Sequence, residues 1–196
     1  MENINKTQKS FGRKVLEAIL GLSTPVLAVL SPGCVEGYTV TPELGVNIPT
    51  SQRFGYQCDS SISHGVRVGV RTKKGVEVEA EARFHNTEYN NGFQINALDA
   101  TDLSMGVVIP LQANGKVEFY AVPRVINRSE KDSVELIGVG NVGSTSRSST
   151  GFGVGVGARF QAGKGSVDAR VMFEGFGKGS YEESGVRVDA GYTFSF

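Results

Sequence analysis

Hydrophobic and polar residues alternate along most of the chain that follows Gly37. In the last eleven residues, from Val186 to Phe196, every second position is apolar and the intervening positions are polar or glycine. A period of two residues places alternate side chains on opposite faces of a β-strand, whereas a helix repeats about every 3.6 residues. The pattern therefore predicts an all-β chain.

The alternation is found in eight segments, which suggests eight strands. An even number of antiparallel strands is typical of single-chain bacterial barrels, and each strand needs about 9–11 residues to cross the hydrocarbon layer at a tilt. All but the second segment are close to that length. We therefore predict an eight-stranded antiparallel up-and-down transmembrane β-barrel. Its strands are expected at 38–48, 66–70, 76–84, 103–111, 117–125, 152–160, 167–173 and 186–196.

The connections between these segments alternate between short and long. Three are tight and contain glycine, at 73–75, 112–116 and 162–165. The others are long and polar. Short turns on one side and long loops on the other are typical of outer-membrane barrels, with the short turns in the periplasm. A surface ligand would therefore meet the long loops, at 49–63, 86–101, 127–150 and 176–184.

Two local features leave questions open. Val134–Val139 alternates weakly, so the third loop either extends its flanking strands above the membrane, with an edge for β-augmentation, or is a mobile polar loop. Pro42 and Pro123 fall in the middle of predicted strands, where each removes a ladder hydrogen bond. We expect these prolines to mark bulges.

The N-terminal segment has the features of a secretory signal peptide. Basic residues precede an apolar run at 18–30, which is too short to span a membrane and contains Pro25. Ser31 and Gly33 form a small-x-small cleavage site. We therefore predict a signal peptide at 1–33 and a barrel at 34–196. The alternative is a retained N-terminal helix, although the rest of the chain has no helical period for it to pack on.

One face of the predicted strands carries almost all of the strand charges. Its bases are all arginine, which pairs with carboxylates through two parallel hydrogen bonds and stays charged when enclosed. An eight-stranded barrel has an interior just wide enough for side chains, so these charges fit a salt-bridged lumen, with nearby glycines leaving room for the arginines. The set is Glu43, Arg67, Arg71, Glu77, Glu79, Glu81, Arg83, Glu118, Arg124, Arg159, Asp168, Arg170, Glu174, Arg187 and Asp189.

The apolar face would then meet lipid. The rival is a soluble barrel with an apolar interior, such as a lipocalin, because periodicity alone does not say which face is inside. The export signal, the unequal loops and the terminal aromatic residue favour the membrane barrel. The 20 basic and 20 acidic residues balance, so composition gives no sign of nucleic-acid binding. We expect a monomer.

Two sequence stretches resemble a known group of proteins. Gly-Phe-Gly-Val-Gly-Val-Gly-Ala-Arg-Phe at 151–160 and Val-Arg-Val-Asp-Ala-Gly-Tyr-Thr-Phe-Ser-Phe at 186–196 are similar to the OmpA/OmpX-like superfamily of small outer-membrane barrels. The resemblance implies the outer membrane of a Gram-negative bacterium, contact with its lipid, and recognition of the last strand by the barrel-assembly machinery. The matching assembly signal is Val188, Ala190, Tyr192, Phe194 and Phe196.

Residues suited to catalysis are few. His64 and His85 are the only histidines, and Asp59, Ser60, Ser61 and Ser63 lie near His64 in the sequence. A Ser/His/Asp site can be drawn from them, but polar rim residues explain them more simply. We predict no catalytic residue, cofactor or metal site. Glu77, Glu79 and Glu81 have arginine partners available, and the two cysteines, Cys34 and Cys58, fall at opposite ends of the predicted barrel, so we expect no disulfide.

Three functions remain for such a chain. The first is a non-enzymatic barrel with a structural and surface-interaction role, whose loops contact other molecules in the manner of an adhesin. The second is a narrow pore for small solutes along the glycine-lined side of the lumen. The third is an enzyme acting on outer-leaflet lipid through His64 or His85. The natural ligand cannot be read from the sequence.

Overall fold

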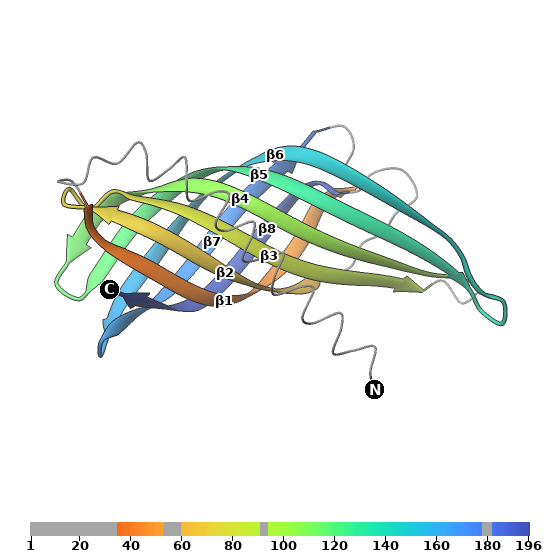
Figure 1. Ribbon diagram of the computed structural model, residues 1–196, viewed down its shortest axis with the longest axis horizontal. Coiled ribbons are helices and arrows are strands. Elements are labelled where there is room, and N and C mark those ends of the chain that lie inside the picture. The colour runs from red at the N-terminus through yellow and green to blue at the C-terminus, as the bar shows by residue number, and fades with distance from the viewer. Residues whose placement is uncertain (1–34, 53–59, 91–93, 178–181) are drawn as a thin grey trace.

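The computed structural model describes residues 35–52, 60–90, 94–177 and 182–196. Its strands pair with their sequence neighbours, all antiparallel, and the last pairs with the first to close a barrel (Figure 1). The predicted fold class is confirmed. The strands are β1 (Val35–Gln52), β2 (Ser61–Thr72), β3 (Glu77–Asn90), β4 (Gln94–Asn114), β5 (Val117–Leu136), β6 (Gly140–Ala162), β7 (Gly165–Phe176) and β8 (Glu182–Ser195).

The alternation places charge inside the barrel and apolar side chains outside. In β7, Asp168 and Arg170 are buried, whereas Val167 and Phe173 on the opposite face are 43% and 57% exposed. The same arrangement holds around the barrel, where large apolar side chains such as Phe152 (70% exposed) point outward. So large an outward apolar surface requires hydrocarbon around it. A soluble barrel with an apolar interior has the opposite arrangement.

The tight turns lie together at one end of the barrel. They join β2 to β3, β4 to β5 and β6 to β7, and each contains a glycine with positive φ: Gly75 (81°), Gly115 (62°) and Gly163 (64°). Chain reversals over so few residues need this left-handed conformation, which glycine adopts without steric penalty. The C-terminus lies at the same end (Figure 1). This end is the periplasmic end in the orientation expected from the loop lengths.

At the opposite end, β3 to β6 continue beyond the other strands, with β3 paired to β4 as far as Asn90 and Ile95 (Figure 1). β4, β5 and β6 contain 21, 20 and 23 residues, about twice the length that a membrane crossing needs. The prediction of loops at 86–101 and 127–150 was therefore wrong for most of these residues. The β4–β5 ladder runs to the pair Gln94 and Leu136, and the β5–β6 ladder to Leu136 and Gly140. We call 86–90, 94–101, 127–136 and 140–150 the extension.

The reason for this error is physical. Neither face of the extension is uniformly apolar, so its sequence has little period-two hydrophobic signal, yet the backbone ladder forms regardless of which side chains it carries. Of the two alternatives for Val134–Val139, the structure has extended strands joined by a tight turn. Gly138 and Gly140, which flank its last residue, have φ of 87° and 93°.

The prolines interrupt ladders without shifting them. Pro42 keeps its pairing with Val66 of β2, but the β1–β8 register has no pair at Thr41 or Pro42 and resumes unchanged at Glu43. Pro123 likewise interrupts only the β4–β5 ladder. The expected bulges are therefore absent at both residues. A register shift occurs in β4 instead, between Pro110 and Gln112.

The predicted signal peptide at 1–33 and both cysteines, Cys34 and Cys58, lie outside the described residues. The boundary at residue 34 therefore remains a prediction, as does the absence of a disulfide. Within the described ranges, no helix is long and apolar enough to cross a membrane.

Candidate functional site: the charged interior and the extension

The structure places all fifteen predicted lumen residues on strands, on the face that lines the interior. Thirteen are buried. The other two, Arg71 and Glu118, lie at the periplasmic mouth with side chains 30% and 16% exposed. The ion pairs among these residues connect strands across the barrel as well as around its wall.

Glu79 of β3 lies at the middle of the interior and binds arginines from across the barrel. Arg170 of β7 donates to both of its carboxylate oxygens, at 2.6 and 2.7 Å, and Arg124 of β5 donates to Oε1 at 2.9 Å. Parallel hydrogen bonds of this kind fix the orientation of both groups. β3 and β7 are therefore joined through the lumen although they share no ladder.

Glu81, two residues further along the same face of β3, forms a second cross-barrel group. Arg187 of β8 donates to its two oxygens at 2.8 and 3.3 Å, and Arg124 also contacts it. Arg187 in turn lies 2.6 Å from Asp189. Arg124 bridges Glu79 and Glu81, so the two groups form one network.

Nearer the extension, the network includes two residues that sequence reasoning missed. Asp102 accepts hydrogen bonds from Arg128 at 2.7 and 2.9 Å and contacts Arg83. Arg83 also binds Glu174, at 3.1 Å. The Arg128 guanidinium lies 3.8 Å from the centre of the Phe176 ring, in a cation–π contact. The alternation along the strands was the available signal, because it places Asp102 on the same face of β4 as Ser104 and Arg128 on the same face of β5 as Arg124.

Towards the periplasm, Asp168 is the shared acceptor. Tyr120 donates its hydroxyl to Asp168 at 2.7 Å, and both Arg67 and Arg159 lie 3.2 Å from it. Tyr120 is fully buried and was also missed. Its ring belongs to a small apolar cluster inside the barrel with Val108, Val122 and Met172. The interior is therefore filled by charged and apolar side chains together.

The interior glycines do not leave an open passage. A methyl group at Gly157 would overlap the Tyr120 ring, and one at Gly155 would overlap the Met172 sulfur. Gly106 and Gly153 do lie against Arg124, because a methyl group added at either glycine would come within 3.1 Å of an Arg124 side-chain carbon. The space at these glycines is occupied by neighbouring large side chains.

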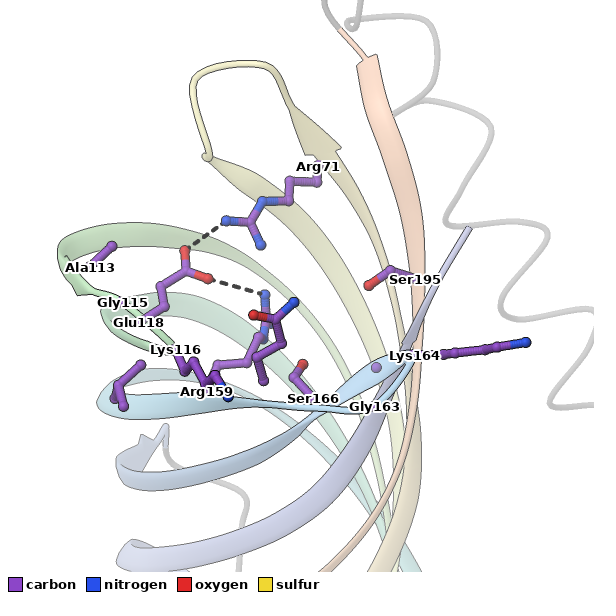
Figure 2. Close-up of a pocket in the computed structure, with 13 residues that line it drawn as sticks. Arg71, Ala113, Gly115, Lys116, Glu118, Arg159, Gly163, Lys164, Ser166 and Ser195 are labelled. Carbon is purple, nitrogen blue, oxygen red and sulfur yellow. Dashed lines mark hydrogen bonds and ion pairs between the residues drawn. The ribbon is translucent and has the colours of Figure 1, made fainter.

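Figure 2 shows the hollow at the periplasmic mouth, with a volume of about 440 Å³. Arg71 and Arg159 point into it from opposite sides, with Glu118 between them. Glu118 accepts a hydrogen bond from Arg71 at 2.9 Å and lies 4.0 Å from Arg159. Arg159 is held further by Glu77, at 3.0 Å. The arginines that line this hollow are thus already paired with carboxylates.

The structure separates the side chains of the Ser/His/Asp site considered from the sequence. His64 is exposed on the outer face of β2, where its ring centroid lies 5.9 Å from that of Phe84. Ser61 and Ser63 are buried on the inner face of the same strand. His85 is buried and lies opposite Ser63 on β3. Asp59 is outside the described residues. His64 and the serines therefore face opposite sides of the barrel wall.

The residues of the expected assembly signal lie on the outer face of β8. Val188, Phe194 and Phe196 are 45%, 46% and 78% exposed. Tyr192 packs edge-on against Phe194, at 4.9 Å between ring centroids, and donates its hydroxyl to the Ala162 carbonyl at 2.7 Å. This strand therefore presents an aromatic surface near the periplasmic end.

The extension has two unlike faces and an open edge. Its inner face carries the buried charges Arg128, Glu130 and Asp132, whereas its outer face carries exposed serine, threonine and asparagine. β7 pairs with β6 only as far as Gly151, and Gly177 then donates its backbone N–H to the Thr150 carbonyl at 3.1 Å. Beyond that bond, no strand of the described ranges pairs with 141–149 on the side away from β5.

An apolar exterior, a charge-filled interior and short turns at one end define an integral membrane barrel of the small eight-stranded class. The chain belongs to the family of the outer membrane protein beta-barrel domain, whose model matches residues 15–194. It is therefore a protein of the outer membrane of a Gram-negative bacterium. No curated protein sequence matches the chain.

Several solved structures share the fold. Neisserial surface protein A is 16% identical, with a TM-score of 0.66, covering 83% of this chain and 99% of its own. Ail, the attachment invasion locus protein of Yersinia pestis, is 18% identical, with a TM-score of 0.51, covering 81% and 99%. A major outer membrane protein from Thermus thermophilus is 10% identical, with a TM-score of 0.58 and the same coverage. At these identities the likeness is one of fold.

Proposed function

We propose that this chain is a non-enzymatic surface-interaction protein, in which the barrel anchors the extension and the extension contacts a partner. The observation that carries the proposal is the open edge of β6 at 141–149. Exposed strand edges bind extended segments of other proteins by adding a strand, with backbone hydrogen bonds supplying affinity. Two proteins with the same fold are Neisserial surface protein A and the attachment invasion locus protein of Yersinia pestis, which is consistent with this role.

The geometry of β6 indicates which residues would bind. The Thr150 carbonyl points towards β7, and main-chain groups alternate in direction along a strand. The N–H groups of Ser146 and Ser148 therefore point to the open edge, whereas those of Arg147 and Ser149 point to β5. A partner strand would use the former pair and leave the β5–β6 ladder intact.

This proposal can be tested with proline. Ser146→Pro with Ser148→Pro removes the two outward N–H groups, and proline is tolerated on an edge strand. We expect the wild-type gene to raise bacterial attachment to epithelial monolayers above that of a strain lacking it, and the proline variant to abolish the gain at an equal level in the outer membrane. S146A/S148A, which keeps both N–H groups, should attach like the wild type. No gain from the wild-type gene, or full attachment by the proline variant, would refute the proposal.

Nothing in the interior favours the other two functions. A pore along the glycine-lined side would need the space that Tyr120, Met172 and Arg124 fill. An enzyme that used His64 with the neighbouring serines would need groups that lie on opposite faces of β2. His85 does lie opposite Ser63 on the inner face, but both side chains are buried, away from the outer-leaflet lipid on which such an enzyme would act. We therefore keep the non-enzymatic role, with outer-membrane lipid around a monomeric barrel and the exposed aromatic residues of β8 as the signal for the assembly machinery.

A further inference from the structure

The end of the β5–β6 hairpin is apolar and exposed. Its residues from Leu136 to Val142 contain no charge, and the nearest charged residues are Glu135 and Arg147. The exposed large apolar side chains in this segment are Leu136 (36%), Ile137 (54%), Val139 (74%) and Val142 (50%). We call residues 136–142 the tip. Exposed apolar side chains gathered in one place on a protein commonly mark an interaction site.

A polar stretch separates the tip from the lipid-facing surface of the barrel. On β5, the exposed residues between Val125 and the tip are Asn127, Ser129, Lys131 and Glu135. On β6, residues 143–151 are all serine, threonine, arginine or glycine. The tip is therefore a second apolar region of the surface rather than the margin of the first.

The tip is too far from the membrane around the barrel to be buried there. Ile137 follows the outward-facing Val125 by twelve residues, which corresponds to about 40 Å of strand. The head-group region of one leaflet is only about 5–8 Å thick, so even strands tilted by about 45° carry the tip well beyond it. Figure 1 shows the β5–β6 turn at the far end of the molecule from the short turns.

The shape of the tip favours a bilayer over a protein pocket. Leu136 and Ile137 are adjacent, so they point to different sides of the hairpin, and both are exposed. A methyl group added at Gly138 or Gly140 would lie in open space. Val139 donates its N–H to the Leu136 carbonyl at 3.0 Å, which closes the turn. A bilayer surrounds an inserted turn on all sides, whereas a pocket or an added strand covers one face.

We propose that the tip inserts into the surface of a second phospholipid bilayer, that of a cell against which the bacterium lies. Because the tip is uncharged, its partner is neutral lipid as much as anionic lipid. The inference goes beyond the proposed attachment role. Strand addition uses backbone groups at Ser146 and Ser148 and needs a protein partner, whereas insertion uses apolar side chains and needs only lipid.

Co-flotation with vesicles measures this binding. The full chain, held in lipid nanodiscs, is mixed with phosphatidylcholine vesicles that carry no protein, and empty nanodiscs give the background. I137S/V139S replaces two apolar side chains of the tip, and I137L/V139I is the matched control that keeps them apolar. We expect the wild type and the control to float with the vesicles, equally well at raised salt, and I137S/V139S to bind at least about tenfold more weakly.

Tryptophan fluorescence locates the inserted residues, because the chain contains no tryptophan. V139W places a single reporter in the tip, and S129W places one on the polar stretch of β5. Brominated lipid is present only in the added vesicles, so the lipid of the nanodisc does not quench either reporter. We expect the emission of V139W to shift to the blue and to be quenched, and that of S129W to stay unchanged.

Three results would overturn the proposal: wild-type nanodiscs that float no more than empty ones, full binding by I137S/V139S, or a V139W reporter that is not quenched. Loss of cell attachment by I137S/V139S without any vesicle binding by the wild type would point to an apolar pocket of a protein instead. S146P/S148P should bind vesicles like the wild type, because protein-free lipid offers no strand to add. Failure of strand addition and failure of insertion can therefore be told apart.

Discussion

The extension continues four of the eight barrel strands, but the two regions are held together in different ways. In the barrel, side chains from opposite walls meet, as Glu79 of β3 and Arg170 of β7 do at 2.6 Å. The extension is a curved sheet whose strands are joined mainly by their ladders (Figure 1), although Arg128, Glu130 and Asp132 are still buried on its inner face. A packed interior tolerates little change, whereas the exposed outer face of the extension can vary. On the proposed function, this difference separates the anchoring region from the region that contacts a partner.

The largest effect is expected from removing one partner of a buried charge pair. Arg83→Met leaves Asp102 without one cation and Glu174 without its nearest one, and all three side chains are buried. Breaking a buried pair in this way typically costs about 3–5 kcal/mol. Urea unfolding in lipid vesicles measures the loss. Arg71→Met, at the partly exposed mouth, should cost less than about 1 kcal/mol. Similar losses for the two variants would show that the interior is not a tightly paired core.

A second effect contrasts glycines in the two regions. Gly157→Ala forces a methyl group into the Tyr120 ring, and overpacking of this kind costs about 1–3 kcal/mol. Gly143→Ala in the extension meets nothing within 4 Å and should change stability by less than about 0.5 kcal/mol. The same unfolding experiment compares them. A neutral Gly157→Ala would mean that the lumen has spare room at this position.

Hydrogen exchange of backbone amides should differ between the two regions in the wild-type protein. Backbone amides at 140–150 have a pairing strand on one side only, so they should exchange through local opening. Amides of β6 at 152–160, which are paired on both sides, should exchange only when the barrel unfolds. Mass spectrometry measures the exchange of both segments. Equal protection would contradict the expected difference between the extension and the barrel.

The smallest effect is expected on the exposed outer face of the extension. Lys131→Ala removes one exposed cross-strand partner of Asp99 and should cost at most about 0.5 kcal/mol. The expected unfolding midpoint is close to that of the wild type. A loss of several kcal/mol would mean that the extension is stabilised by its surface charges.

How much the sequence could predict depended on where lipid imposes a pattern. In β6 from Phe152 to Phe160, hydrocarbon excludes charge from one face, so the side-chain alternation revealed both the strand and its orientation. Arg128 and Glu130 lie on the same inward face of β5, but beyond the hydrocarbon no apolar neighbours marked them as strand residues. The pairing of Arg170 with Glu79, 91 residues away, depends on barrel closure and could not be read from the sequence.

The barrel interior is filled by paired charges and a small apolar cluster. Single-channel recording of the wild-type protein in planar lipid bilayers tests this most directly, because a filled lumen leaves no path for ions. After insertion of folded, heat-modifiable protein, the expected current is indistinguishable from that of the bare bilayer. Reproducible discrete openings would contradict it and would favour the pore.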